Sequence, residues 1–113
     1  MKKLIFSIFA LAAISTSVHA QNVNIPDANF KAYLVGNTAI NTNGDTEIQV
    51  TEATAFNGAI NCFNLGISDF TGLESFTAIT ELICTSNNLS SVDVSNNTSL
   101  IYLYCEQNLL TSL

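Results

Sequence analysis

One segment of this chain occurs twice, and the repetition constrains the fold more than any other feature of the sequence. Residues 79–92 align with residues 100–113 when the second segment is shifted by 21 positions. A fixed period of this length is typical of a solenoid, in which successive turns stack and bury one continuous core. Among the residues that coincide are Leu82 and Leu103, Cys84 and Cys105, Asn87 and Asn108, and Leu89 and Leu110.

Each unit has the pattern apolar-x-x-apolar-x-Cys-x-x-Asn-x-apolar-x-x-apolar, which resembles the leucine-rich repeat with cysteine in its third apolar position. A third copy fits upstream, with Cys62 in the cysteine position and Leu65 in place of the asparagine. Residues 67–74 resemble the bacterial, internalin-like repeat, and residues 93–98 resemble the 21-residue internalin variant that carries a column of cysteines. The resemblance implies an α/β solenoid, a short leucine-rich repeat array of about three turns with a parallel β ladder and a small helical N-terminal cap.

The first twenty residues have the composition of a secretory signal peptide. Lys2 and Lys3 precede the apolar run at residues 4–14, and a small-residue cleavage site ends at Ala20. We therefore expect a secreted or cell-surface protein that begins at Gln21 and does not insert into a membrane after cleavage. We assign residues 1–20 to the signal peptide, 21–57 to an EF-hand-like helical cap and 58–113 to the repeats, with turns at about 58–78, 79–99 and, incompletely, 100–113.

Removal of the signal peptide would leave a strongly acidic chain. Lys31 is then the single basic residue beside nine acidic ones, and His19, the only histidine, is lost. A chain of this kind cannot neutralise phosphates, which argues against nucleic acid as a partner. It also lacks the histidine on which most acid–base and nucleophilic catalysis depends. We therefore expect a protein that is not an enzyme.

The repeat pattern places its cysteines inside the solenoid. Side chains alternate along a strand, so Leu82 and Cys84 should point inward while Ile83 points outward. An inward cysteine behaves as a small apolar residue. We expect Cys62, Cys84 and Cys105 to form a buried ladder of free thiols, because parallel strands suit disulfide geometry poorly and no C-x-x-C pair favours a metal.

The asparagines of the repeat should hold the turns together. Asn87 and Asn108 stand where the chain leaves the strand, and their amides can satisfy backbone groups that would otherwise be buried without partners. Leu65 cannot do this in the first turn. We expect that turn to be looser, or to be closed by the N-terminal cap.

Two short helices are expected in the cap. Pro26 and Asp27 indicate a helix start, and Phe30 and Leu34 follow at helical spacing. A second helical pattern covers residues 52–56.

The segment between these helices, residues 41–52, resembles an EF-hand calcium loop. Asn41 replaces the usual aspartate of its first position, and Thr46 replaces the glycine of its sharp turn. Internalin-like proteins carry a degenerate EF-hand-like cap, so two interpretations stay open: a structural cap without a cofactor, and a weak calcium site. The candidate ligands are Asn41, Asn43, Asp45, Glu47 (through its backbone carbonyl) and Glu52.

The outward side of the strands is the candidate binding surface. Exposed tyrosines among acidic groups suit a protein or a carbohydrate partner, because tyrosine offers apolar area and a polar tip. Alternatively, these residues only cover a short sheet as good strand formers. The resemblance implies a binding module for protein–protein interaction, adhesion included; a calcium-binding structural module and a non-functional fragment of a longer repeat protein are the alternatives. The surface consists of Phe63, Glu81, Ile83, Tyr102, Tyr104 and Glu106.

The last repeat ends on an apolar residue. Leu113 occupies the final apolar position, and nothing polar follows it in this sequence. An uncovered apolar end beside an unpaired strand edge favours end-to-end self-association.

Overall fold

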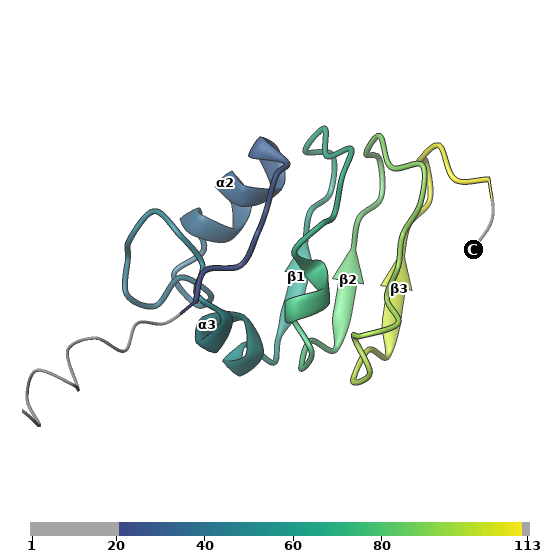
Figure 1. Ribbon diagram of the computed structural model, residues 1–113. Helices are drawn as coiled ribbons and strands as arrows, with labels where there is room; N and C mark the ends of the chain where they lie inside the picture. Colours follow the sequence, from purple (N-terminus) through teal and green to yellow (C-terminus); the bar gives the residue numbers. More distant parts are fainter. Residues whose placement is uncertain (1–20, 112–113) are drawn as a thin grey trace, which may run out of the picture.

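The computed structural model describes residues 21–111. The predicted signal peptide, residues 1–20, and Leu113 lie outside the described residues. Three short strands, β1 (Ala59–Asn61), β2 (Glu81–Ile83) and β3 (Tyr102–Tyr104), form a parallel sheet in the order β1-β2-β3 (Figure 1). Each strand belongs to a different turn of the repeat, so the chain advances by one strand with each turn.

The register of the sheet follows the 21-residue period. Leu82 of β2 lies beside Ile60 of β1 on one side and beside Leu103 of β3 on the other. The ladder continues past the strands, because the Cys84 N–H donates to the Tyr104 carbonyl at 2.8 Å. Leu82 and Cys84 are fully buried, whereas Ile83 between them is partly exposed. The alternation expected from the sequence is therefore present.

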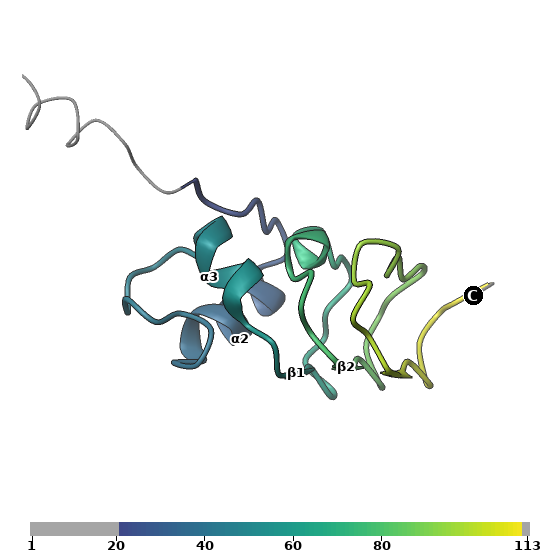
Figure 2. The same ribbon diagram turned by 90° about the horizontal axis from the view of Figure 1, so that it is seen from below.

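The cap consists of α2 (Ala28–Gly36), α3 (Val50–Ala55) and the loop between them (Figure 2). Asp27 is the N-cap of α2, and its Oδ1 accepts hydrogen bonds from the N–H groups of Asn29 and Phe30 at 3.0 and 2.9 Å. Pro26 therefore lies before the helix rather than in its first turn. No helix among residues 21–111 is both long and apolar enough to cross a membrane.

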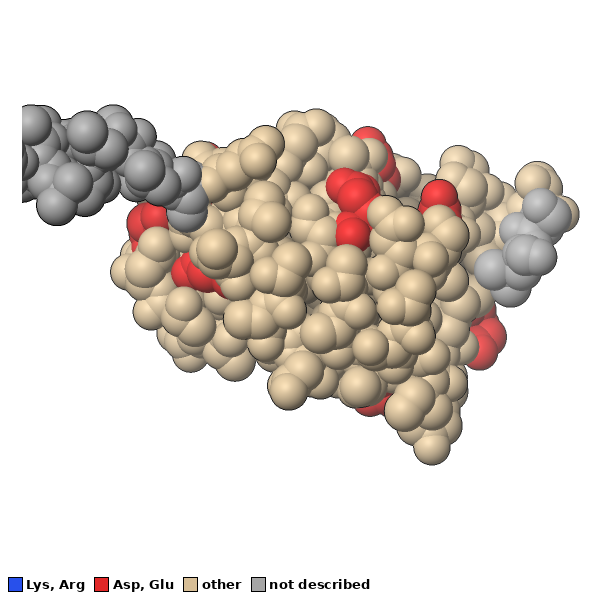
Figure 3. Space-filling view, turned by 60° about the horizontal axis from the view of Figure 1, so that its bottom comes forward, with Lys and Arg blue, Asp and Glu red and all other residues tan. Residues whose placement is uncertain are grey.

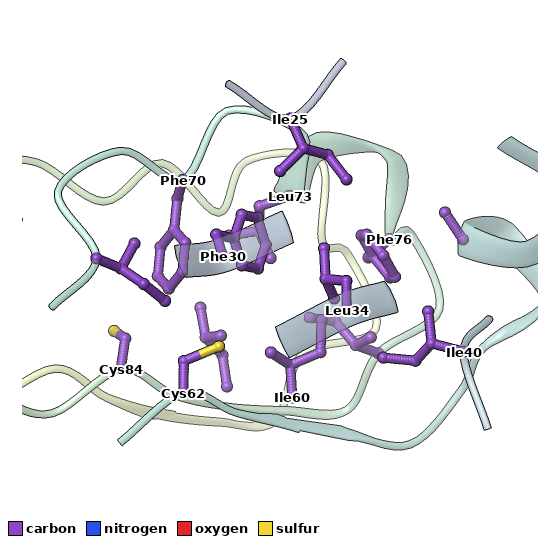
Figure 4. Packing of buried hydrophobic residues seen from close by; sticks show 14 of the residues in the cluster. Ile25, Phe30, Leu34, Ile40, Ile60, Cys62, Phe70, Leu73, Phe76 and Cys84 are labelled. Atoms are coloured by element: carbon purple, nitrogen blue, oxygen red, sulfur yellow. The ribbon is translucent and has the colours of Figure 1, made fainter. Parts of the chain in front are cut away.

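One apolar core runs from the cap into the repeats. Phe30 and Leu34 on one side of α2 are fully buried, and the Phe30 ring meets the Phe70 ring of the first turn edge to face, with centroids 4.8 Å apart. The 3-10 helix η1 (Leu73–Ser75) closes the back of that turn. In Figure 4, Cys62 and Cys84, which directly follow β1 and β2, point into this core.

Polar contacts also dock the cap onto the first turn. The Asp27 Oδ2 accepts hydrogen bonds from the N–H groups of Ser68 and Asp69 at 3.0 and 3.3 Å. The Asn29 Nδ2 donates to the Gly66 carbonyl at 3.2 Å. The first turn, which has Leu65 in place of asparagine, is thus closed by the cap, as one of the two expectations from the sequence stated.

Candidate functional site

The outward side chains of β2 and β3 form a small grid. Glu81 lies beside Tyr102, and Ile83 lies beside Tyr104, because these residues are register partners. One step further along, the Thr85 Oγ1 donates to the Glu106 Oε2 at 2.9 Å. An apolar and aromatic centre is therefore bordered by a carboxylate at each end of the two strands.

The aromatic residues of this surface are open to solvent. Tyr102 is 55% exposed, Tyr104 is 41% exposed, and Phe63, which follows β1, is 56% exposed. The structure places all six residues predicted for the binding surface at or near the outward side of the ladder, but Phe63, which follows β1, is two turns away from the tyrosines of β3. The Tyr33 hydroxyl of α2 accepts a hydrogen bond from the Asn61 N–H at 3.0 Å, which joins the cap to the edge of this sheet. We name the outward residues of β2 and β3, with Thr85 and Glu106, the strand face.

The charge of the described molecule is almost entirely negative. Its single lysine, Lys31, donates to both carboxylate oxygens of Glu47, at 2.9 and 3.0 Å. On the surface seen in Figure 3 no basic residue is visible, and acidic residues are scattered over an otherwise uncharged surface. Within residues 21–111, the carboxylates of Glu81 and Glu106 therefore have no cationic partner.

The cysteine ladder lies on the inner side of the same strands. The three thiols are free, and Cys62 and Cys84 are fully buried. Burial, with a smaller effect of the neighbouring thiol, raises the pKa of Cys62 and of Cys84 to about 12. Cys105 departs from the prediction, because it is only partly buried. Among the described residues no further turn covers it.

The asparagines of the repeat bind the backbone of two turns at once. The Asn87 Oδ1 accepts from the N–H groups of Leu65 and Ile67, at 3.1 and 3.0 Å, in the preceding turn. Its Nδ2 donates to the carbonyls of Cys62 and Cys84, at 2.8 and 2.9 Å.

Asn108 repeats this arrangement one turn later. Its Nδ2 donates to the carbonyls of Cys84 and Cys105, at 2.9 and 3.1 Å, and its Oδ1 accepts from the Leu89 N–H at 3.0 Å. Each asparagine thus fixes the spacing between neighbouring strands.

The EF-hand-like loop brings some of its predicted ligands together, but protein donors already contact them. Glu52 is 9% exposed, and its carboxylate accepts from the Gln49 N–H at 3.0 Å and from the Asn43 N–H at 3.2 Å. The Asp45 Oδ2 accepts from the Gln49 Nε2 at 2.9 Å. The Glu47 carboxylate instead forms an ion pair with Lys31.

Asn41, the first predicted ligand, is buried rather than directed to an open site. Its Nδ2 donates to the carbonyls of Val35 and Asp45, at 2.9 and 2.7 Å. Gly44, with a φ of +73°, supplies a left-handed turn that the sequence pattern expected two positions later. Across residues 21–111, no three acidic, cysteine or histidine side chains gather so that they could hold a metal ion. Calcium binding stays a prediction.

The chain is similar to internalins in sequence and in fold. No protein-family model matches the chain. Over 40 residues the chain is 48% identical to internalin J of Listeria monocytogenes serotype 4b, a match that covers 35% of this chain and 4% of that protein. The fold superposes on the functional domain of internalin J, which includes a cysteine ladder, with a TM-score of 0.68 and 38% identity over 84% of this chain and 21% of that one. This chain is an internalin-like leucine-rich repeat protein.

A second Listeria structure supports the fold of this internalin-like chain. An internalin (inlF) superposes with a TM-score of 0.70 at 18% identity, over 84% of this chain and 28% of that one. The fold class predicted from the repeat pattern is therefore confirmed. The chain spans about a fifth to a quarter of the solved internalin structures that it matches.

Sequence reasoning missed one structural residue of this internalin-like array. Asn97 is 3% exposed, and its Nδ2 donates to the carbonyls of Leu73 and Phe76, at 3.0 and 2.8 Å, on the back of the preceding turn. On the back of the solenoid, Asn97 thus binds the backbone of the preceding turn, as Asn87 does on the strand side. The position one period earlier holds Phe76, so no repetition marked it.

Proposed function

We propose that this chain is a secreted or cell-surface binding module that contacts a partner protein through its strand face. The observation that carries the proposal is the pair of exposed tyrosines on a rigid ladder, Tyr102 and Tyr104. The inward neighbours of the tyrosines, Leu103 and Cys105, are partly buried against the core, and Asn108 binds the backbone of both turns, which supports a preorganised surface. Tyrosine is among the residues that dominate protein interfaces.

A binding role, rather than catalysis, also agrees with the chemistry present. The strand face offers carboxylates, tyrosines, an isoleucine and the Thr85 hydroxyl, which donates to Glu106, and residues 21–111 contain no histidine to act as a base. The free thiols of Cys62 and Cys84 are buried, and their raised pKa keeps them protonated. The signal-peptide pattern of residues 1–20 supports the proposed secretion.

The test compares two double variants of the purified chain on a panel of purified extracellular and matrix proteins. Tyr102→Ser with Tyr104→Ser removes aromatic area from the strand face. Ile101→Ser with Leu109→Ser removes apolar area from residues that are 69% and 64% exposed but lie outside the outward strand positions. We expect only the tyrosine variant to lose binding, by about tenfold or more. Equal loss in both variants, or no loss in either, contradicts the proposal.

We further propose that the EF-hand-like loop is a structural cap. Glu52 supports this, because its carboxylate accepts from the Gln49 N–H at the start of α3 and so completes a capping box. The alternative, a calcium-binding module, is tested by calorimetry of the wild type and of Glu52→Gln. We expect no heat of calcium binding and a lower melting temperature for Glu52→Gln; a calcium heat that this substitution abolishes would favour the metal site.

A further inference from the structure

We propose that the strand face accepts an extended, basic segment of a polypeptide, with cationic side chains over the tyrosines and between the two carboxylates. This inference rests on the proposed binding function and names the chemistry of the partner. It concerns Tyr102, Tyr104, Glu81 and Glu106, with Ile83 at the centre.

The register of the ladder sets the spacing that such a partner must match. Glu81 lies level with Tyr102, and Glu106 follows Tyr102 by four positions along the chain. At about 3.3 Å per residue, the two carboxylates stand roughly 13 Å apart along the strand direction. An extended segment therefore meets both when its basic residues are four positions apart, because side chains at even spacing share one face of a strand.

The surfaces between the carboxylates also favour a cation. Tyr102 and Tyr104 are exposed, and the face of a tyrosine ring attracts lysine and especially arginine side chains. Ile83 beside Tyr104 adds apolar area for the methylene groups of the same side chains.

No basic side chain among residues 21–111 is available to pair with Glu81 or Glu106. Lys31 is the single basic residue of the described chain, and both oxygens of Glu47 hold it in the cap. The Glu106 carboxylate accepts only the neutral Thr85 hydroxyl among residues 21–111. The acidic surface as a whole attracts cations at long range, and the two carboxylates give that attraction a fixed position.

The experiment titrates the purified chain with three short, end-blocked peptides, followed by NMR or calorimetry at low ionic strength. The first peptide is Arg-Ser-Thr-Ser-Arg, the second has the same composition with adjacent arginines, and the third has glutamate in place of both arginines. We expect the spaced peptide to bind about threefold or more tightly than the adjacent isomer, and the acidic peptide not to bind. Binding of the spaced peptide should weaken strongly between about 20 and 200 mM salt.

Three single variants locate the site. Glu81→Gln and Glu106→Gln should each weaken binding of the spaced peptide by about threefold. Asp93→Asn is the matched control: it removes one negative charge from the back of the repeat, where Asp93 accepts from the Ser95 N–H, and it should change the affinity little.

Several outcomes would overturn the inference. Equal weakening by all three variants would mean attraction to net charge alone. Tyrosine-dependent binding of a neutral oligosaccharide, without binding of the spaced peptide, would assign the face to carbohydrate. If the serine variants of Tyr102 and Tyr104 lose protein binding while the glutamine variants bind normally, the proposed function stands and only the basic partner is wrong.

Discussion

Asn87 shows how much of this fold depends on single side chains. Its amide has hydrogen bonds to five backbone groups in two turns. The repeat pattern predicted that role, because asparagine alone among the repeated residues offers both a donor and an acceptor at the point where the chain turns inward. The sequence did not show which N–H groups of the preceding turn, those of Leu65 and Ile67, the Asn87 amide would bind.

Replacing Asn87 by alanine should therefore be one of the most damaging single changes. The N–H groups of Leu65 and Ile67 and the Cys62 carbonyl would lose this partner, whereas the Cys84 carbonyl would keep the Asn108 amide. Each buried unpaired group costs about 1–3 kcal/mol. We expect the free energy of unfolding to fall by about 3 kcal/mol or more, measured by urea denaturation. Asn88→Ala, at the exposed neighbour, is the control and should have little effect. Similar losses for both variants would show that the amide network is not what joins the turns.

Because Cys62 and Cys84 are buried as protonated thiols, the stability of the folded protein should fall at alkaline pH. Burial raises the pKa of Cys62 and Cys84 from 9.0 to about 12. The folded state thus retains protons that the unfolded chain releases, so this contribution is complete below pH 9 and is lost as the pH rises towards 12. We expect the melting temperature to fall across that window, and to fall less in Cys84→Ala. An equally steep fall in Cys84→Ala would assign the effect to other groups.

At the scale of elements, the strands and helices were predictable, and their contacts were less so. Alternation predicted the inward Leu82 and the outward Ile83 of β2, and Asp27 marked the start of α2. The sequence could not show that Asp27 also binds Ser68 and Asp69, because these lie 41 and 42 residues away and share no pattern with the helix. Gly72 is a similar case: a Cβ there would lie 2.8 Å from the Ile25 Cγ1, so the glycine lets the start of the cap pack against the first turn.

Asp27 both caps α2 and binds the first turn, so the stability that it contributes should depend on the ionisation of its carboxyl. Burial raises the pKa of its carboxyl, but the hydrogen bonds from Ser68, Phe30, Asn29 and Asp69 together lower the pKa below the ordinary value. The stabilisation is therefore present above the unfolded pKa of about 3.9 and is lost as the pH falls through the lower folded value.

We expect Asp27→Ala to cost about 1–2 kcal/mol of stability at pH 7, since it removes both the N-cap and the contact to the first turn. The difference from the wild type should shrink below pH 4, measured by denaturation across a pH series. Glu81→Gln, at the strand face, is the control. A difference that stays constant down to pH 2 would contradict the role of the ionised carboxylate.

At the scale of the whole molecule, cap and repeats share one core, and the two sides of the ladder have separate tasks. The inward residues Ile60, Cys62, Leu82 and Cys84 belong to the core that also contains residues of the cap, while outward residues such as Tyr102 are exposed. The repeat pattern predicted this division for the strands. It overestimated the burial of Cys105, because burial depends on a neighbouring turn that a single repeat does not describe.

The division between the two sides is also the claim on which the proposed binding surface depends, since a shift of one residue would exchange them. The most direct test is thiol labelling of folded Phe63→Cys, read by mass spectrometry at each cysteine. Phe63 is 56% exposed, and its neighbour Cys62 is fully buried. We expect the cysteine introduced at position 63 to react at nearly the rate of a free thiol, and Cys62 to react at least about 100-fold more slowly until denaturant is added. Equal rates at the two positions in the folded protein would contradict the account.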